Sequence, residues 1–204
     1  MNITKLSSTA KKLSVFFRVL RKIVGITTIV MLCVLVVLTI ANAVNPDTVI
    51  GTELNVLELG SVSLELKTEE TPSNNSLLVY AWCLGILGSA WAAVLYIGIG
   101  YVRKILAPME AGQPFGKETG SYFKKLAVLS IVWGIAENIG TLLEGHVALK
   151  VFGLDQLAGS DALQSISINY NLDLTFLAVF GLLMLMSYVF NYGAELQKLS
   201  DETL

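Results

Sequence analysis

The chain has 204 residues, of which 54% are hydrophobic and only 15% are charged, and its net charge is −2. A soluble globular domain carries about 25% charged residues, so this composition excludes an ordinary soluble domain and favours a membrane protein. Nucleic-acid binding by the chain itself is not expected, because its basic residues lie where membrane topology alone accounts for them.

Four long apolar segments divide the chain. A helix needs about 20 apolar residues to cross about 30 Å of hydrocarbon, and each segment approaches or exceeds that length. We therefore expect one domain over residues 1–204, an all-α membrane protein built as a four-helix transmembrane bundle. Its expected parts are a basic N-terminal helix (1–22), four spans (23–44, 77–102, 126–145 and 174–194), two outer loops (45–75 and 146–173), an inner loop (103–125) and a tail (195–204).

The basic residues predict the orientation. All lysines and arginines except Lys67 and Lys150 precede the first span, separate the second from the third, or follow the fourth. Cytoplasmic segments carry the excess of such residues, so we expect both termini to be cytoplasmic.

Two alternatives stay open near the N terminus. Residues 1–22 either lie on an anionic leaflet as an amphipathic helix or run directly into the first span. That span resembles a signal peptide ending at Ala41-Asn42-Ala43, but its apolar stretch is longer than the roughly 7–15 residues of a signal core and favours an uncleaved anchor.

The outer loops contain the alternation of apolar and polar residues that is typical of half-buried strands. Residues 62–66 alternate in this way, and residues 54–59 precede them across a Gly60-Ser61 turn, which predicts a β-hairpin. The same alternation at residues 166–170 predicts a third strand of a small extracytoplasmic sheet.

The third span carries a carboxylic acid, Glu137, near its centre. Charge at that depth is costly, so an acid there is a candidate functional site, with an acid hydrogen-bonded between helices as the structural alternative. Steps of three and four residues separate Glu137 from other polar side chains of this span, so they share one helix face. Ser89 of the second span lies at comparable depth and is the expected partner of Glu137. The candidate intramembrane site is Glu137, Asn138, Ser89, Thr141 and Glu144.

The cysteines predict neither a disulfide nor a metal site. Cys33 and Cys83 lie inside apolar spans at different depths, and we expect both to be buried as small hydrophobic side chains. The sequence has no Cys/His spacing for zinc, no nucleotide loop and no paired nucleophile and base, so we expect no cofactor and no enzymatic activity.

Two short motifs carry a family resemblance. The C-terminal stretch reads Phe190-Asn191-Tyr192-Gly193-Ala194-Glu195-Leu196-Gln197 and closes on Ser200-Asp201-Glu202-Thr203-Leu204. It resembles the ending of a bacterial family of small four-helix membrane proteins of unknown function, and the inner-loop Gly112-Gln113-Pro114-Phe115 is similar to that family's other recurrent motif. Where many members have a basic residue before the tyrosine, this chain has Asn191.

The resemblance implies a bacterial inner-membrane location. Members are often encoded beside a small helix-turn-helix regulator, which implies a soluble partner at the cytoplasmic loop and tail. The residues expected to contact it are Gly112, Pro114, Phe115, Tyr192, Gly193, Glu195 and Gln197.

These observations favour a non-enzymatic sensory, regulatory or immunity-type module that resides in the lipid bilayer and contacts a cytoplasmic partner. The alternative is a small transporter or proton-coupled carrier that uses Glu137. The sequence predicts no particular oligomeric state.

Overall fold

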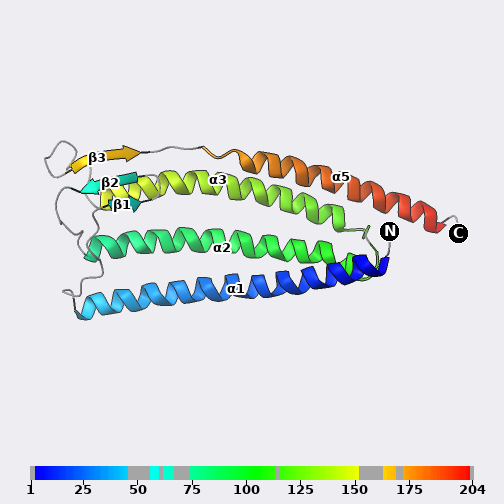
Figure 1. The fold of residues 1–204 in the computed structure, drawn as a ribbon, viewed down its shortest axis with the longest axis horizontal. Coiled ribbons are helices and arrows are strands. Elements are labelled where there is room, and N and C mark those ends of the chain that lie inside the picture. The colour runs from blue at the N-terminus through cyan, green and yellow to red at the C-terminus, as the bar shows by residue number, and fades with distance from the viewer. Residues whose placement is uncertain are drawn as a thin grey trace. The chain divides into compact units, whose positions relative to one another are not determined.

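The computed structural model describes residues 3–45, 56–59, 62–66, 74–113, 115–151, 163–168 and 172–202. The elements within these ranges follow one another as Figure 1 shows them. They are α1 (Ile3–Val44), β1 (Val56–Leu59), β2 (Val62–Leu66), α2 (Asn74–Glu110), α3 (Thr119–Val151), β3 (Leu163–Ile168) and α5 (Thr175–Glu202).

Four helices in the described part of the chain are long and apolar enough to cross a membrane, as the apolar segments predict. The shortest, α5, has 28 residues and is about 42 Å long, which exceeds the thickness of the hydrocarbon core. The segments that meet the criterion are Ser7–Val44, Asn75–Glu110, Thr119–Val147 and Thr175–Ser200.

The helices extend beyond the predicted spans. α1 is continuous from Ile3, so the basic N-terminal residues run directly into the first apolar segment. α2 continues to Glu110 and α3 begins at Thr119, which leaves only residues 111–118 of the predicted inner loop between the two helices. α3 also continues to Val151, inside the predicted outer loop. Hydropathy marks where the apolar residues end, whereas helical hydrogen bonding continues through good helix formers such as Lys and Arg.

The end of α2 explains why a glycine is needed there. Pro108 lies inside the last turn of the helix, where the sequence placed it in a loop. The Gln113 N–H donates to the Pro108 carbonyl at 3.0 Å and the Gly112 N–H donates to the Met109 carbonyl at 3.2 Å, the paired bonds of a Schellman motif. Gly112 has a φ of 78°, a left-handed conformation that glycine adopts without steric cost.

The chain forms two compact units. The first comprises Met1–Thr27, Trp91–Ile135 and Asp173–Leu204, and the second comprises Thr28–Ala90 and Ala136–Leu172. In the first unit the start of α1 packs against the end of α2. The Ser7 hydroxyl donates to the Glu110 carbonyl at 2.6 Å, and Ala10 is buried.

Helices α3 and α5 approach each other closely in the first unit. The buried Ser187 hydroxyl donates to the Gly120 carbonyl at 2.7 Å, and a Cβ at Gly120 would lie 2.9 Å from the Ser187 carbonyl oxygen. A Cβ at Gly134 would overlap the side chain of Phe176. Small residues at these positions allow two membrane helices to pack with their backbones close together.

The second unit contains a three-stranded antiparallel sheet of order β1-β2-β3. Leu57 pairs with Leu64, and Leu64 pairs in turn with Ile166. The strands overlap the stretches in which alternating residues predict them, although residues 54–55, 60–61 and 169–170 of those stretches lie outside the described part of the chain.

Both cysteines are free and exposed on the chain, so the expectation that they are buried is wrong. A membrane protein faces lipid tails that are as apolar as its own core, and hydrophobicity therefore does not separate inward from outward side chains in a span.

Candidate functional site

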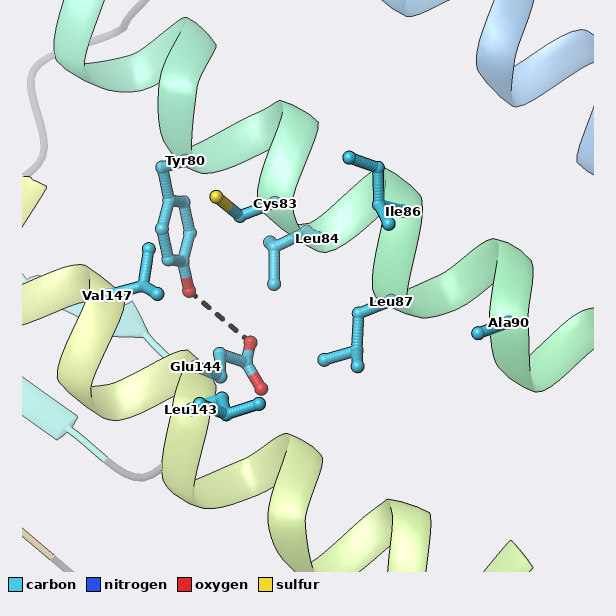
Figure 2. Close-up of a pocket in the computed structure, with 9 residues that line it drawn as sticks. All are labelled: Tyr80, Cys83, Leu84, Ile86, Leu87, Ala90, Leu143, Glu144 and Val147. Atoms are coloured by element: carbon cyan, nitrogen blue, oxygen red, sulfur yellow. Dashed lines mark hydrogen bonds between the residues drawn. The ribbon is translucent and has the colours of Figure 1, made fainter.

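A tyrosine and a glutamate meet between two helices of the second unit. Tyr80 lies in the second turn of α2 and is only 8% exposed. Its hydroxyl donates a hydrogen bond to Glu144 Oε1 on α3 at 3.3 Å. Figure 2 shows the two groups pointing toward each other across the space between α2 and α3. The bond fixes one oxygen of an acid in an otherwise apolar environment.

This pair lies in the wall of a cavity of about 320 Å³. Binding sites for small molecules are typically apolar pockets with a few fixed polar groups, and their volumes start near 300 Å³. Among the described residues that line the cavity Glu144 is the one acid, and Cys83 places a thiol in the wall (Figure 2). The apolar lining consists of Leu84, Ile86, Leu87, Ala90, Leu143 and Val147.

The arrangement suits one class of ligand. The aliphatic wall can hold an apolar body, while the Glu144 carboxyl can accept a hydrogen bond or pair with a cation. The Tyr80 hydroxyl already donates to one carboxyl oxygen, so it holds that oxygen in place without neutralising the acid. A small amine with an apolar tail combines both requirements.

The two hydroxyl-bearing members of the predicted polar site, Ser89 and Thr141, donate within their own helices. The Thr141 hydroxyl donates to the Glu137 carbonyl at 3.0 Å, and the Ser89 hydroxyl donates to the Gly85 carbonyl at 2.6 Å. Ser89, the expected partner of Glu137, thus donates its one hydroxyl proton within α2 and not to the Glu137 carboxyl. Glu137 and Asn138 are half-buried and have interaction partners of their own.

Sequence reasoning included Glu144 but missed the tyrosine that contacts it. Spacing along α3 places Glu144 on a polar face, but it does not show which residue of α2 lies opposite. One signal was available. A tyrosine near the start of one span and an acid near the end of the next lie at similar depth when consecutive helices are antiparallel.

The two family-like motifs meet in the first unit. The centre of the Phe115 ring lies 5.6 Å from the centre of the Phe190 ring, and the centres of the Phe190 and Phe123 rings are 4.9 Å apart. A Cβ at Gly193 would overlap the Phe115 ring. Phe115 therefore packs on the tail helix α5 at the position where the absence of a side chain leaves room for it. Pro114 lies outside the described residues.

This packing divides the predicted partner-contact residues into two groups. Gly112 closes the Schellman motif, and Phe115 with Gly193 connects the loop to α5, so these three have structural roles. Tyr192 is 64% exposed and Glu195 is also exposed, which leaves both available to a partner. Gln197 is half-buried.

Comparisons with protein-family models, curated proteins and solved structures give no match. The two motifs thus stay a resemblance, and the function has to be argued from the site itself. Among the described residues, no group of three or more His, Cys, Asp and Glu side chains is placed to hold a metal ion.

Proposed function

We propose that this chain is a non-enzymatic sensory or regulatory membrane module that binds a small apolar amine in the pocket of Tyr80 and Glu144. The observation that supports it best is the apolar cavity with one acid in its wall, whose Oε1 accepts the Tyr80 hydroxyl bond at 3.3 Å. A pocket of this kind selects a ligand by its shape and by its charge.

The proposed location is a bacterial inner membrane with both termini in the cytoplasm. The support is the concentration of basic residues before, between and after the spans on one side, together with four helices of sufficient length. Reporter fusions at each terminus test the orientation. Activity of a cytoplasm-specific reporter at both ends is expected, and activity of a periplasm-specific reporter at either end would contradict it.

The proposed output is contact with a soluble cytoplasmic partner, of the helix-turn-helix type by family resemblance. Its support in the structure is the exposure of Tyr192 and Glu195 beside a rigidly packed loop. Photo-crosslinking from position 195, the exposed first residue of the predicted tail, should capture a soluble protein in living cells. The same probe at Leu182, an exposed apolar position inside the predicted span 174–194, should not. Equal yields from both positions would contradict a specific contact.

A second candidate is a proton-coupled carrier that uses Glu137. Its support is the position of this half-buried acid two helical turns before Glu144 on α3. Flux into proteoliposomes that depends on Glu137 and is lost in Glu137→Gln would favour this alternative, and absence of flux in both proteins would exclude it.

The ligand proposal is tested by thermal unfolding of the purified full-length protein in a neutral detergent. Octylamine carries an ammonium group on an apolar tail, and octanol is its uncharged analogue. A ligand that binds only the folded state raises the unfolding midpoint in a concentration-dependent manner. Octylamine should therefore raise the midpoint more than octanol does in the native protein.

Two variants identify the responsible acid. Glu144→Gln should abolish the advantage of octylamine, because a neutral amide cannot pair with an ammonium group. Glu137→Gln makes the same carboxyl-to-amide change on the same helix and should retain the advantage. The proposal fails if octanol and octylamine stabilise the native protein equally, or if Glu137→Gln loses the response while Glu144→Gln keeps it.

A further inference from the structure

A second cavity lies in the first unit, along one face of α3. Its volume is about 360 Å³, and Tyr101 of α2 forms part of its wall. The α3 residues that line it follow the steps of three and four that define one helix face. From the start of α3 they are Ser121, Lys124, Lys125, Val128, Leu129 and Val132.

This face changes character along its length. The end near the start of α3 presents a hydroxyl and two ammonium groups, whereas Val128 is 54% exposed and Val132 is 48% exposed at the other end. The twelve residues from Ser121 to Val132 cover about 16 Å of helix. A ligand that fills this groove has a polar, anionic end and an apolar end at least several carbons long.

Positive charge is concentrated at the polar end. The Lys125 and Lys104 ammonium groups lie 5.1 Å and 5.3 Å from the centre of the Tyr122 ring, and Lys124 lines the cavity itself. The acid at this location is Glu118, whose Oε2 accepts the Tyr122 hydroxyl bond at 2.7 Å.

The three ammonium groups are not neutralised by neighbouring acids. Among the described residues the ion pair observed is Lys198–Glu202, and none of Lys104, Lys124 and Lys125 takes part in one. Cations that are not paired within the protein attract anions from outside it. Basic pockets beside transmembrane helices are known sites for anionic lipid head groups.

We propose that this groove binds an anionic phospholipid, with the phosphate at Lys124 and Lys125 and an acyl chain along Val128, Leu129 and Val132. The charge of the polar end matches the head group and the apolar end matches the chain. Free phosphate would use the polar end alone and leave the apolar face without a role. This site is separate from the Tyr80–Glu144 pocket and does not depend on the function proposed for that pocket.

The test uses the full-length protein in nanodiscs of phosphatidylcholine. Dibrominated phosphatidylglycerol or dibrominated phosphatidylcholine is added as a quencher of tryptophan fluorescence. Trp133 directly follows Val132 in α3 and packs on Trp91 at 6.5 Å, so a chain in the groove lies close to this pair. The ratio of quenching by the phosphatidylglycerol to quenching by the phosphatidylcholine measures the preference for the anionic head group.

The variants separate the site from general electrostatics. One basic residue near an anionic head group contributes about a fivefold preference, so Lys124→Gln/Lys125→Gln should reduce the preference by about thirtyfold, to near unity. Lys117→Gln/Lys198→Gln removes the same charge outside the groove and should leave the preference within about twofold. Val132→Phe keeps every charge and adds no tryptophan but fills the apolar end, and should also abolish the preference.

Each contrary result overturns the proposal. Equal losses in the two lysine pairs would show diffuse attraction to the membrane surface. An unchanged preference in Val132→Phe, together with full competition by inorganic phosphate, would show a phosphate site without a lipid chain. Equal quenching by both lipids in the native protein would show that the groove does not select an anionic head group.

Discussion

The close approach of α3 to α5 makes Gly120→Ala the most informative stability variant. The new Cβ would lie 2.9 Å from the Ser187 carbonyl oxygen and would overlap the Asn191 side chain. Ordinary contact begins near 3.4 Å, so α5 has to retreat by about half an ångström or more. Asn191 can change its rotamer, but the Ser187 carbonyl belongs to a helix backbone and cannot move alone.

The magnitude follows from two opposed effects. Overpacking of a tight contact costs about 1–3 kcal/mol. Retreat of α5 also lengthens the 2.7 Å hydrogen bond from the Ser187 hydroxyl to the Gly120 carbonyl, and a hydrogen bond between membrane helices contributes about 0.6 kcal/mol. Replacing glycine by alanine returns about 1 kcal/mol in a helix interior, and at most that at Gly120, the second residue of α3. We expect Gly120→Ala to lower the free energy of unfolding by about 1–2 kcal/mol.

Gly181→Ala is the matched control. Gly181 also lies inside a helix, α5, but an added Cβ meets no atom within 4 Å, so this variant should be neutral or more stable by up to about 1 kcal/mol. Reversible unfolding in mixed micelles, followed by helical circular dichroism, measures both. The reasoning is refuted if Gly120→Ala is as stable as Gly181→Ala.

Two further predictions concern the ends of helices. Gly112→Ala forces a Cβ into the left-handed conformation at φ 78° and should cost about 1–2 kcal/mol in the same unfolding assay, whereas Gly112→Asn should cost less because asparagine tolerates that conformation. The hydroxyl and the backbone N–H of Thr175 donate to Asp173 and hold the pKa of its carboxyl below the usual range. A depressed pKa in the folded state means that this contribution is present above the ordinary Asp pKa near 4 and is lost as the pH falls through the lower, folded value. Unfolding midpoints measured from pH 7 downward should show an acid loss of stability that is smaller in Asp173→Asn, and equal profiles would contradict the role of this carboxylate.

The sequence predicts the four long helices well, because about 20 apolar residues in succession have few other uses. It predicts the helix ends poorly. Pro108 and most residues of the short α2–α3 loop are polar or helix-breaking in sequence, yet α2 continues through Pro108 to Glu110. A prediction from hydropathy follows the membrane boundary, and the helix does not end there.

Contacts between helices were the least predictable feature. Small residues recur four apart on α2 at Gly85, Ser89 and Ala93, a spacing that indicates close packing of membrane helices. The side chain nearest Gly85 belongs to another helix, at Leu35 of α1. The pairing of Tyr80 with Glu144 depends on the relative rotation of α2 and α3, which spacing within one helix does not contain. Ser89 was assigned to Glu137 by depth alone and bonds to its own helix instead.

The central claim is that Glu144 confers selectivity for an ammonium ligand on the pocket. Cys83 is exposed and lines that pocket, so in a Cys33→Ser background it reports occupancy through its rate of reaction with a thiol reagent. A hydrogen bond to a charged group contributes about 1.5–3 kcal/mol, and octylamine should therefore protect Cys83 at concentrations at least about tenfold lower than octanol requires. Glu144→Gln should abolish this difference. Equal protection by the two compounds in the native pocket, or an unchanged difference in Glu144→Gln, would contradict the claim.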